Sequence, residues 1–340
     1  MSALPLISSK FNHLHSNDNR LSLSVVVPFY NESSVIAECH DRLVAVLNTI
    51  EEHSEIIYVD DGSTDGSRQL VEQFSANNIS VKYIGLSRNF GKEAAMSAGL
   101  EHTKGKAVIV LDADLQDPPE LIPSMIDKWK EGYDVVNMQR IKRQGETWFK
   151  RFSAKCFYKI LNAVSDIDVP SNVGDFRLLS REVVLHINQM PERNRYMKGI
   201  FSWPGFKQIT LPFVRDARFS GESKWNYIKL IGLAVDGITS FSIKPLRIAA
   251  ILGGAIALWA FIYGMVIIVK TMIFSESVSG YPSMMVVQLA LGGIQLLCMG
   301  VMGEYIGRIF IETKHRPLYL IQTIIEQPAL STAQVYGKSK

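Results

Sequence analysis

Cysteine is scarce in this 340-residue sequence. The three cysteines, Cys39, Cys156 and Cys298, lie far apart and form no C-x-x-C pair. A disulfide framework and a cysteine-ligated zinc site are therefore not expected, and a reducing compartment fits the composition. Net charge is also small, at +3. A charge of this size gives no indication of a nucleic-acid partner, so none is expected.

Two glycine-rich nucleotide signatures are absent as well. The sequence contains neither G-x-G-x-x-G nor G-x-x-x-x-G-K-[ST], which argues against a dinucleotide fingerprint and a phosphate loop. The first twenty residues lack a long apolar run, so we expect no signal peptide there, only a disordered polar tail. The histidines show no ligand spacing and are expected at the surface or in loops.

Two long apolar runs are present near the C-terminus. Residues 248–269 and 284–303 contain no charged side chain and comprise 22 and 20 residues. Each run is long enough to cross a bilayer core of about 30 Å. A buried core helix is the alternative, but two such runs within a short stretch favour a membrane hairpin.

The charges around these runs predict its orientation. The connecting stretch 271–283 has no lysine or arginine, whereas both outer flanks are basic through Lys244, Arg247, Arg308, Lys314 and Arg316. By the positive-inside rule, both flanks are cytoplasmic and the connection is external. The sequence therefore predicts a cytoplasmic N-terminal domain and a cytoplasmic C-terminal tail, joined by the hairpin.

The N-terminal part alternates between strand and helix patterns. Five short apolar runs predict strands, at 21–30, 55–60, 81–89, 106–114 and 133–140. Stretches with helical spacing separate them, and Asp117 before Pro118-Pro119 is expected to cap one of these helices. This alternation predicts an α/β fold with a mostly parallel sheet. From 145 to 245 the pattern is less regular, with amphipathic helices expected at 148–164, of which 148–159 is basic and aromatic, and at 225–242.

Polar side chains follow three of the predicted strands. Residues 28–32, residues 60–62 and the pair Asp112 and Asp114 come where a strand ends. In such sheets, ligands bind beyond the carboxyl ends of the strands, so these residues are expected to line one crevice. Asp112, Asp114 and Gln116 offer hard oxygen ligands, which suit Mg²⁺ or Mn²⁺ together with substrate phosphates. A solvated turn of helix-capping acids is the alternative interpretation.

Five ordered motifs make the resemblance specific: VVVPFYNE, VDDGSTDGS, RNFGKEAAMSAGL, LDADLQDPPE and GDFRLLSR. In order and spacing they resemble the inverting family 2 glycosyltransferases with the Rossmann-like GT-A fold. Within that family the chain is most similar to polyprenyl-phosphate glycosyltransferases, which include dolichyl-phosphate mannose synthase and, more closely, bacterial bactoprenol glucosyltransferases of O-antigen modification. The resemblance covers about residues 21–320, nearly the whole chain.

The resemblance implies roles for individual residues. It assigns nucleotide-sugar binding to Pro28, Tyr30, Glu32, Asp61, Arg218 and Lys224. The D-x-D-x-Q motif for the metal and the donor corresponds to Asp112, Asp114 and Gln116. Asp175 corresponds to a residue that the family needs for catalysis. Lipid-phosphate binding falls to Arg140 and Arg151, with Arg143 as a rival.

The implied reaction moves a hexose, with glucose favoured, from a UDP-sugar to undecaprenyl phosphate. Mannose, galactose or an aminoarabinose derivative are alternative sugars. A phosphate monoester has a second pKa of about 6, so the acceptor is already an anion at neutral pH and needs no strong base. Asp175 is therefore expected to position or stabilise charge first, with a general-base role as the alternative. Arg177 either pairs with Asp175 or binds phosphate.

The resemblance also implies a bacterial inner-membrane enzyme that assembles as a homo-oligomer, as related tetramers do. The expected boundaries are a tail at 1–20, a GT-A domain at 21–224, an interfacial helix at 225–245, transmembrane helices within 246–311 and a cytoplasmic tail at 312–340. Two rival interpretations are open. A processive polysaccharide synthase would carry more spans and a Q-x-x-R-W motif, which is missing here. A non-catalytic membrane sensor of sugar nucleotides would not need D-x-D-x-Q together with Asp175.

Overall fold

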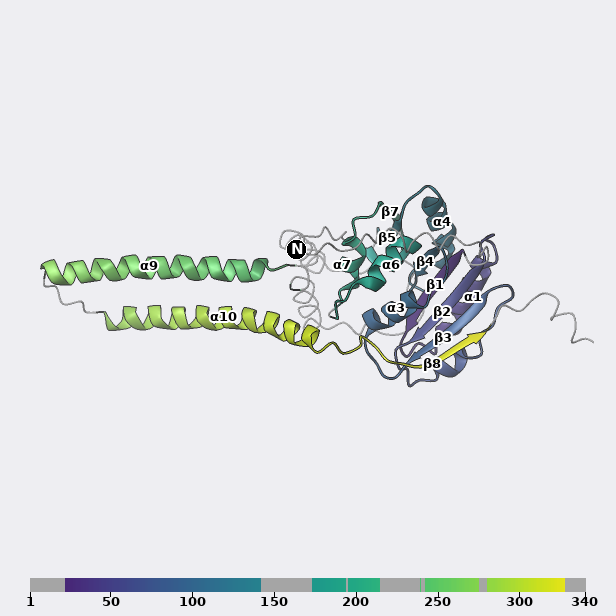
Figure 1. Ribbon diagram of the computed structural model, residues 1–340, viewed down its shortest axis with the longest axis horizontal. Coiled ribbons are helices and arrows are strands. Elements are labelled where there is room, and N and C mark those ends of the chain that lie inside the picture. Colours follow the sequence, from purple (N-terminus) through teal and green to yellow (C-terminus); the bar gives the residue numbers. More distant parts are fainter. Residues whose placement is uncertain are drawn as a thin grey trace, which may run out of the picture.

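The computed structural model describes residues 22–141, 173–193, 195–214, 239, 242–274 and 280–327. These residues form an α/β domain from which two long helices extend together (Figure 1). Four of the predicted site residues lie outside the described residues: Arg143, Arg151, Arg218 and Lys224. The predicted helix 148–164 and nearly all of 225–242 lie outside them too.

The domain is built on one eight-stranded sheet with the order β7-β5-β6-β4-β1-β2-β3-β8. β1 pairs in parallel with β2 and β4, and the β2–β3 and β5–β7 pairs are also parallel. The β4–β6, β5–β6 and β3–β8 pairs are antiparallel. The strands span Leu23–Phe29 (β1), Ser54–Asp60 (β2), Ser80–Leu86 (β3), Ala107–Val110 (β4), Val135–Arg140 (β5), Val173–Ser180 (β6), Gln208–Phe213 (β7) and Ile321–Gln327 (β8).

Helices cover both faces of this sheet, which explains why its central strands are apolar throughout. Along β1, Val25 and Val27 face one hydrophobic cluster, and Val26 faces another. The first cluster includes side chains of α1 (Ile36–Leu47) and α4 (Ile122–Lys130). The second includes side chains of α3 (Lys92–Glu101), α6 (Arg181–Gln189) and α7 (Met197–Ser202). The remaining short helices are α2 (Ser67–Val71) and the 3-10 helix η3 (Pro119–Leu121).

Helix α3 packs unusually close to β1. A Cβ atom at Gly99 would lie 2.3 Å from Cγ1 of Val26, so only glycine lets the helix approach this strand. All residues from Ala94 to Leu100 are buried. Helix α3 is thereby held firmly against the sheet.

The five strands predicted from the sequence correspond to β1–β5. The less regular stretch after them contains β6, α6, α7 and β7, which the sequence pattern did not predict. The predicted capping role of Asp117 is wrong: Pro118 precedes η3, and no side chain caps that helix. Instead, the buried Asp117 carboxylate forms an ion pair with Arg140 at the end of β5.

His40 also departs from the expectation that the histidines lie at the surface. Its ring is buried, stacks on Phe74 at 4.3 Å and lies within 3.0 Å of the Tyr58 hydroxyl. Burial lowers the pKa of His40, because desolvation disfavours the imidazolium form. This histidine therefore packs in the core as a neutral residue.

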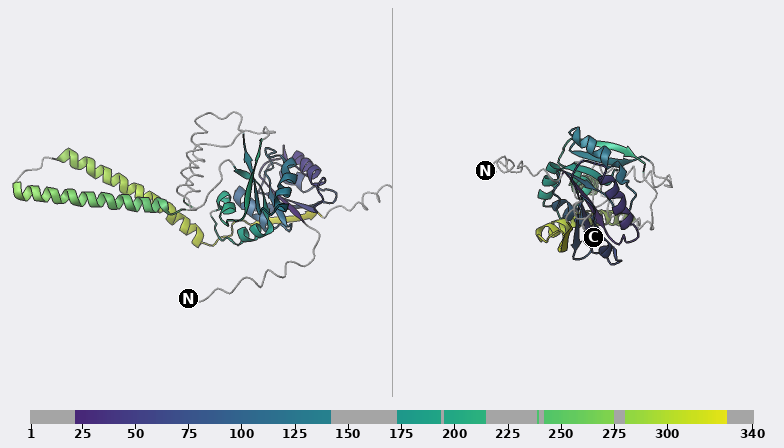
Figure 2. Two further views of the ribbon diagram at one scale, coloured as in Figure 1. Left: turned by 90° about the horizontal axis from the view of Figure 1, so that it is seen from above. Right: turned by 90° about the vertical axis from the view of Figure 1, so that its right-hand side faces the viewer.

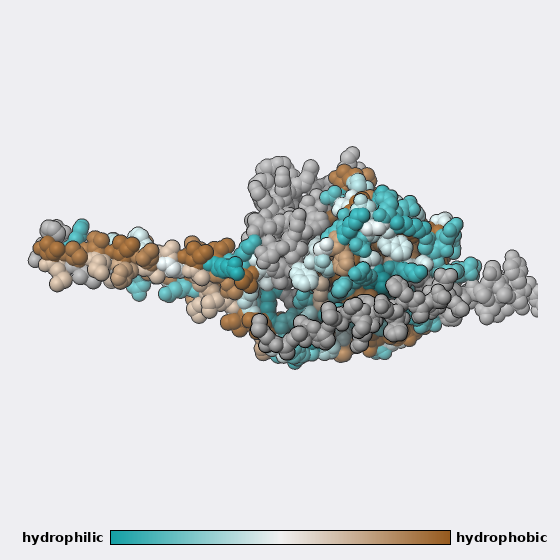
Figure 3. Space-filling model, turned by 45° about the horizontal axis from the view of Figure 1, so that its top comes forward, coloured by the Kyte–Doolittle hydropathy of each residue, from teal (hydrophilic) through white to brown (hydrophobic). Residues whose placement is uncertain are grey.

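Two helices, α9 (Lys244–Phe274) and α10 (Tyr281–Thr313), contain the two apolar runs. They extend away from the domain side by side (Figures 1 and 2). With 31 residues, α9 is about 46 Å long at the usual helical rise, which exceeds the thickness of a bilayer core. No residue of its apolar window is buried, and its surface is hydrophobic whereas the domain is mostly hydrophilic (Figure 3). Both helices thus suit a lipid environment.

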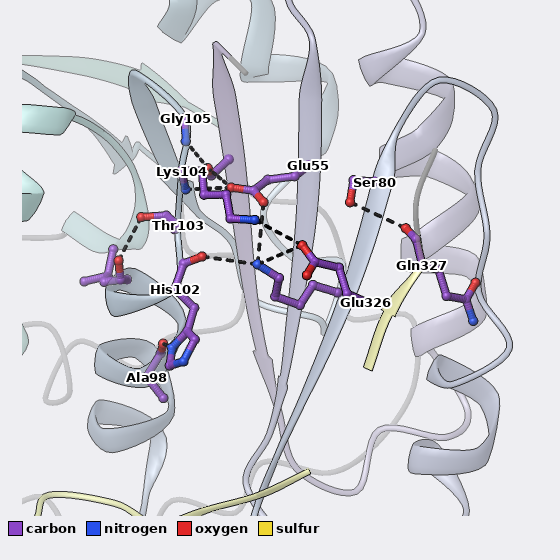
Figure 4. A network of polar contacts seen from close by, with 12 residues as sticks. Glu55, Ser80, Ala98, His102, Thr103, Lys104, Gly105, Glu326 and Gln327 are labelled. Carbon is purple, nitrogen blue, oxygen red and sulfur yellow. Dashed lines mark hydrogen bonds and ion pairs between the residues drawn. The ribbon is translucent and has the colours of Figure 1, made fainter. Parts of the chain in front are cut away.

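The stretch predicted as a C-terminal tail contains strand β8. After α10 the chain returns to the domain, and β8 pairs with β3 at the edge of the sheet (Figure 1). Glu326 of β8 reaches the buried Lys82 ammonium at 3.4 Å, and Lys104 at 3.3 Å (Figure 4). Glu55, on the other side of Lys82, lies 4.0 Å away. This network attaches β8, which follows the second helix of the hairpin, to the α/β domain.

Replacing Glu326 with alanine is expected to destabilise the domain by about 1 kcal/mol, because half-exposed ion pairs contribute no more than this. Lys82 and Lys104 hold the pKa of Glu326 below its ordinary value, against the effect of burial. The contribution is therefore present at neutral pH and lost on acidification. Thermal unfolding at pH 7 and pH 4 checks this, with Gln322→Ala on the same strand as the control. Equal destabilisation by both variants at both pH values would contradict it.

Candidate active site

The candidate site lies beside β1, where the order in which the chain adds strands to the sheet reverses. The chain runs from β1 to β2 and β3 on one side of β1, and then crosses through α3 to β4 on the other side. Ligands bind at such a switch point, beyond the carboxyl ends of the strands. Here the polar segments after Phe29 and after Val110 come together, because β1 and β4 are neighbours in parallel register.

The loops after β1 and β2 form one rim of the site. Asn31 adopts a left-handed conformation with φ 55°. Its backbone N–H donates to Ser63 Oγ (3.0 Å), and its side-chain oxygen accepts from the Thr64 N–H (2.8 Å). Asp65 accepts from the Ser33 N–H at 3.0 Å. Of the predicted nucleotide-binding residues on this rim, Pro28 is buried within β1 and Tyr30 is exposed.

Glu32 belongs to the same rim. Its backbone N–H donates to Ser67 Oγ at 3.0 Å, and its carbonyl accepts from the N–H groups of Val35 and Ile36. The loop that carries Glu32 is therefore fixed by backbone contacts to the loop after β2. The Glu32 side chain can therefore bind a ligand without a change in the conformation of this loop.

Asp61 anchors the loop that leads into α3. Its carboxylate accepts the backbone N–H groups of Phe90 (2.7 Å) and Gly91 (2.9 Å). Burial raises the pKa of Asp61, although these two donors oppose the shift. The following Gly62 has φ +75°, and a Cβ there would lie 2.6 Å from the Arg88 carbonyl carbon. The sequence did not predict this anchoring role, which a carboxylate can combine with ligand binding through its other lone pairs.

The D-x-D-x-Q segment turns sharply after β4. Leu115 adopts φ 56°, and the Gln116 N–H donates to Asp114 Oδ1 at 3.2 Å. Leu115 itself is buried, whereas Asp112 and Asp114 are both half-buried. Gln116 is 8% exposed. The polar side chains of the motif thus lie around one tight turn that follows β4.

Lys92 joins two of the predicted site residues. Its Nζ lies 2.6 Å from Asp112 Oδ1 and 2.5 Å from Asp175 Oδ2. The three side chains come from α3, the end of β4 and β6. The structure therefore brings Asp175 next to the D-x-D-x-Q motif, as the predicted site requires, and places a lysine between them.

The charges of Lys92, Asp112 and Asp175 shift one another's pKa values. Burial disfavours the Lys92 ammonium, but the carboxylates of Asp112 and Asp175 outweigh it and raise the pKa of Lys92. Burial would likewise raise the pKa of Asp175, yet Lys92 and then Lys198 lower it below its ordinary value. For Asp112, burial prevails over Lys92 and raises the pKa. Asp175 is therefore a firmly ionised carboxylate and a weak base.

Two more ionisable residues lie close to Asp175. Burial, then the charge of Asp175, raises the pKa of Glu93 to about 7, and Glu93 Oε2 is buried without a hydrogen-bond partner among the described residues. Arg177 is buried, donates to the Gly174 carbonyl at 2.7 Å and lies over the Phe201 ring at 4.1 Å. Its guanidinium thus has structural contacts of its own, and burial lowers the pKa of Arg177 to about 10.

Arg140, a predicted lipid-phosphate residue, forms a two-pronged contact with Asp117. Its Nη2 lies 3.2 Å from Oδ1 and 3.1 Å from Oδ2 of a carboxylate that is 0% exposed. A Cβ at Gly174 would lie 2.8 Å from the same Nη2, so glycine provides the space for the guanidinium. The structure gives Arg140 a stabilising role that the sequence did not predict.

The donor set fits a metal that is shared with a substrate. Within the described residues, no group of three or more His, Cys, Asp or Glu side chains is arranged to hold a metal ion. Lys92 already neutralises charge on Asp112 and Asp175. Asp114 and Gln116 offer hard oxygen donors at the same turn, and Mg²⁺ commonly uses one or two carboxylates plus substrate phosphates.

Sequence reasoning missed Lys92 and Glu93, although both lie in the quoted motif RNFGKEAAMSAGL. One local signal was present. Lys92 is the first residue of α3, where the helix dipole disfavours a positive charge, so a lysine there calls for a nearby acid. The identity of that acid could not be deduced locally.

Comparison with known proteins agrees with this geometry. Residues 24–187 match Glycosyl transferase family 2, and residues 244–309 match the GtrB C-terminal hairpin. An uncharacterized glycosyltransferase of Synechocystis sp. is 49% identical over 89% of this chain and 96% of its own. The prophage bactoprenol glucosyl transferase homolog of Escherichia coli is 45% identical over 89% and 99%. The bactoprenol glucosyl transferase of Shigella phage SfX is also 45% identical, over 89% and 99%.

These matches cover both the α/β domain and the two apolar helices, which associate the chain with a membrane. The protein belongs to glycosyl transferase family 2: it is a glycosyltransferase with a GT-A domain and a C-terminal hairpin of the GtrB type.

Proposed function

We propose that this enzyme transfers glucose from UDP-glucose to undecaprenyl phosphate, with inversion at the anomeric carbon. The product, a polyprenyl-phosphate sugar, would serve cell-surface glycan modification of the O-antigen type. The relatives named as bactoprenol glucosyl transferases support the sugar and the acceptor. The observation that carries the proposal is the meeting of Asp175 with the D-x-D-x-Q segment at the switch point, in a chain that also has the hairpin.

On the donor side, Asp114 and Gln116 would hold Mg²⁺ or Mn²⁺ together with the diphosphate. A bound dication supplies positive charge where negative charge grows on the leaving group. The rim residues Tyr30, Glu32 and Asp61 would bind the nucleoside, with Pro28 shaping the floor beneath it. Arg218 and Lys224 would contact the phosphates.

On the acceptor side, the attacking group is a phosphate oxygen that is already ionised. Asp175 has a pKa below the ordinary range, so it would act by holding charge and geometry near the anomeric carbon, and no proton needs to be removed. The remaining obstacle is repulsion between two phosphates. Arginine suits this task because its guanidinium pairs with phosphate through two hydrogen bonds, and Arg140, Arg143 and Arg151 are the proposed partners.

The hairpin would keep the site near the acceptor. A polyprenyl phosphate leaves its tail in lipid and its headgroup at the surface. The basic residues at the domain-side ends of α9 and α10, which include Lys244, Arg247 and Arg316, favour a cytoplasmic domain in a bacterial inner membrane. Assembly as a homo-oligomer, such as a tetramer, is part of the same proposal.

The test is a donor screen with the full-length chain in detergent or nanodiscs, Mg²⁺ and undecaprenyl phosphate. UDP-glucose is expected to give UDP at a rate that depends on the lipid phosphate, at least tenfold above GDP-mannose, UDP-galactose and nucleotide-linked aminoarabinose. Undecaprenol without phosphate is the matched acceptor control. Faster turnover with another donor would replace glucose. Binding of UDP-glucose without acceptor-dependent UDP release would favour a sensor instead of an enzyme.

A further inference from the structure

Two carboxylates face each other across the junction of β4 and β6. The strands pair antiparallel, with Val110 opposite Arg177 and Ile109 opposite Leu178. β4 ends at Val110, and two residues further on Asp112 lies close enough to Asp175 for both carboxylates to contact one ammonium group. Like charges at so short a distance repel each other. The sheet therefore needs a positive charge between these two acids.

Lys92 provides that charge from a third element. Its Nζ contacts Asp112 at 2.6 Å and Asp175 at 2.5 Å. The start of α3 is held in place by the Asp61 carboxylate, which accepts the N–H groups of Phe90 and Gly91. The rest of the helix is held by the close packing of Gly99 on Val26. The ammonium group is thus delivered from a rigid support, although the side chain remains 44% exposed.

We propose that Lys92 is a positioning residue of the transfer reaction: it cross-links Asp112 to Asp175 and leaves the cation site to Asp114 and Gln116. This inference rests on the function proposed above. It gives the two aspartates of the D-x-D motif different roles. Asp112 binds an internal cation, and Asp114 serves the metal.

The electrostatics support this division. A dication that bound Asp112 as well would lie next to the Lys92 ammonium, so the two positive charges would repel. Unlike a metal, the ammonium also persists when the donor leaves. Asp175 consequently keeps one orientation throughout the reaction cycle, which is what a group that stabilises developing charge requires. A purely structural ion pair is the competing explanation, and the experiment must separate the two.

The first measurement is steady-state kinetics of full-length K92Q and K92R with UDP-glucose and undecaprenyl phosphate. K92Q is expected to lower kcat about 100-fold, a usual loss for a preorganised electrostatic group, with the KM for each substrate changed less than threefold. K92R is expected to recover at least tenfold of that loss, because it restores the charge. Wild-type kcat in K92Q, or no recovery in K92R, would overturn the proposal.

The second measurement is Mn²⁺ binding in the presence of UDP, followed by electron paramagnetic resonance of the free ion, which needs no turnover. D112N is expected to keep its Mn²⁺ affinity within threefold of wild type, whereas D114N loses at least tenfold. An equal loss in both variants would overturn the division of the motif. If the wild-type chain transfers no sugar to lipid, the proposed function fails, but this titration still tests the assignment of Asp112.

A folding control covers the case in which K92Q is unstable. The double variant K92Q/D112N removes one positive and one negative charge, so the net charge of the trio is unchanged. It is expected to melt within a few degrees of wild type and to stay as slow as K92Q, because Asp175 has lost its anchor. A double variant that regains wild-type kcat would show that Lys92 serves folding alone, and would overturn the proposal.

Discussion

Replacing Asp114 with asparagine is expected to lower turnover on the order of 10³-fold while the fold stays intact, because the variant loses the charge that would hold the dication against the leaving diphosphate. Asp114 lies half-buried in the turn after β4, where its Oδ1 accepts one backbone N–H. Asparagine preserves that hydrogen bond, so the loss should be confined to the metal. UDP release and thermal melting of the full-length chain measure the two effects.

Asp127→Asn is the matched control, since Asp127 is an exposed aspartate on α4, away from the D-x-D-x-Q turn. It is expected to leave turnover and melting unchanged. An Asp114→Asn variant with wild-type turnover would remove the metal assignment. A variant with a much lower melting temperature would instead show that Asp114 stabilises the turn.

The second large effect concerns stability. Removing the Arg140 side chain by Arg140→Ala is expected to cost about 3–5 kcal/mol, because it leaves a buried carboxylate without its partner. That carboxylate belongs to Asp117, which is 0% exposed and lies 3.1 Å from the guanidinium. Thermal or denaturant unfolding in detergent measures the loss. A loss below about 1 kcal/mol would mean that the pair contributes no more than an exposed ion pair.

The double variant Arg140→Met with Asp117→Leu is the control for this experiment. Replacing a whole buried ion pair with apolar side chains is often neutral, so most of the lost stability is expected to return. Kinetics of the same double variant then test the proposed lipid-phosphate role of Arg140. A raised KM for undecaprenyl phosphate in a stable double variant would support that role, and an unchanged KM would leave it to Arg143 and Arg151.

The sequence was sufficient for the features that local patterns determine. The continuous apolar run of β1 and the alternation of strands with helices predicted the parallel half of the sheet. Two runs of at least 20 residues without a charge predicted the two long helices. The β6 and β8 strands were missed because antiparallel partners decide them. β6 carries Asp175 and Arg177 within an otherwise apolar strand, and β8 pairs with a strand more than 200 residues away in sequence.

The candidate site shows the same limit. The acids of D-x-D-x-Q could be identified from their place at the end of a strand. The role of Lys92 could not, because its partners lie 20 and 83 residues away. Asp117 is the reverse case: a local rule predicted a helix cap, and a tertiary partner, Arg140, binds the carboxylate instead. Side chains whose function depends on distant charges are thus the ones that sequence reasoning assigns least well.

The most direct test of the account is the mass of the lipid recovered after the full-length enzyme has been incubated with UDP-glucose, Mg²⁺ and undecaprenyl phosphate. The account predicts a lipid phosphate that carries one added hexose, formed in equal amount with UDP. Recovery of UDP and free glucose beside unmodified lipid would contradict it.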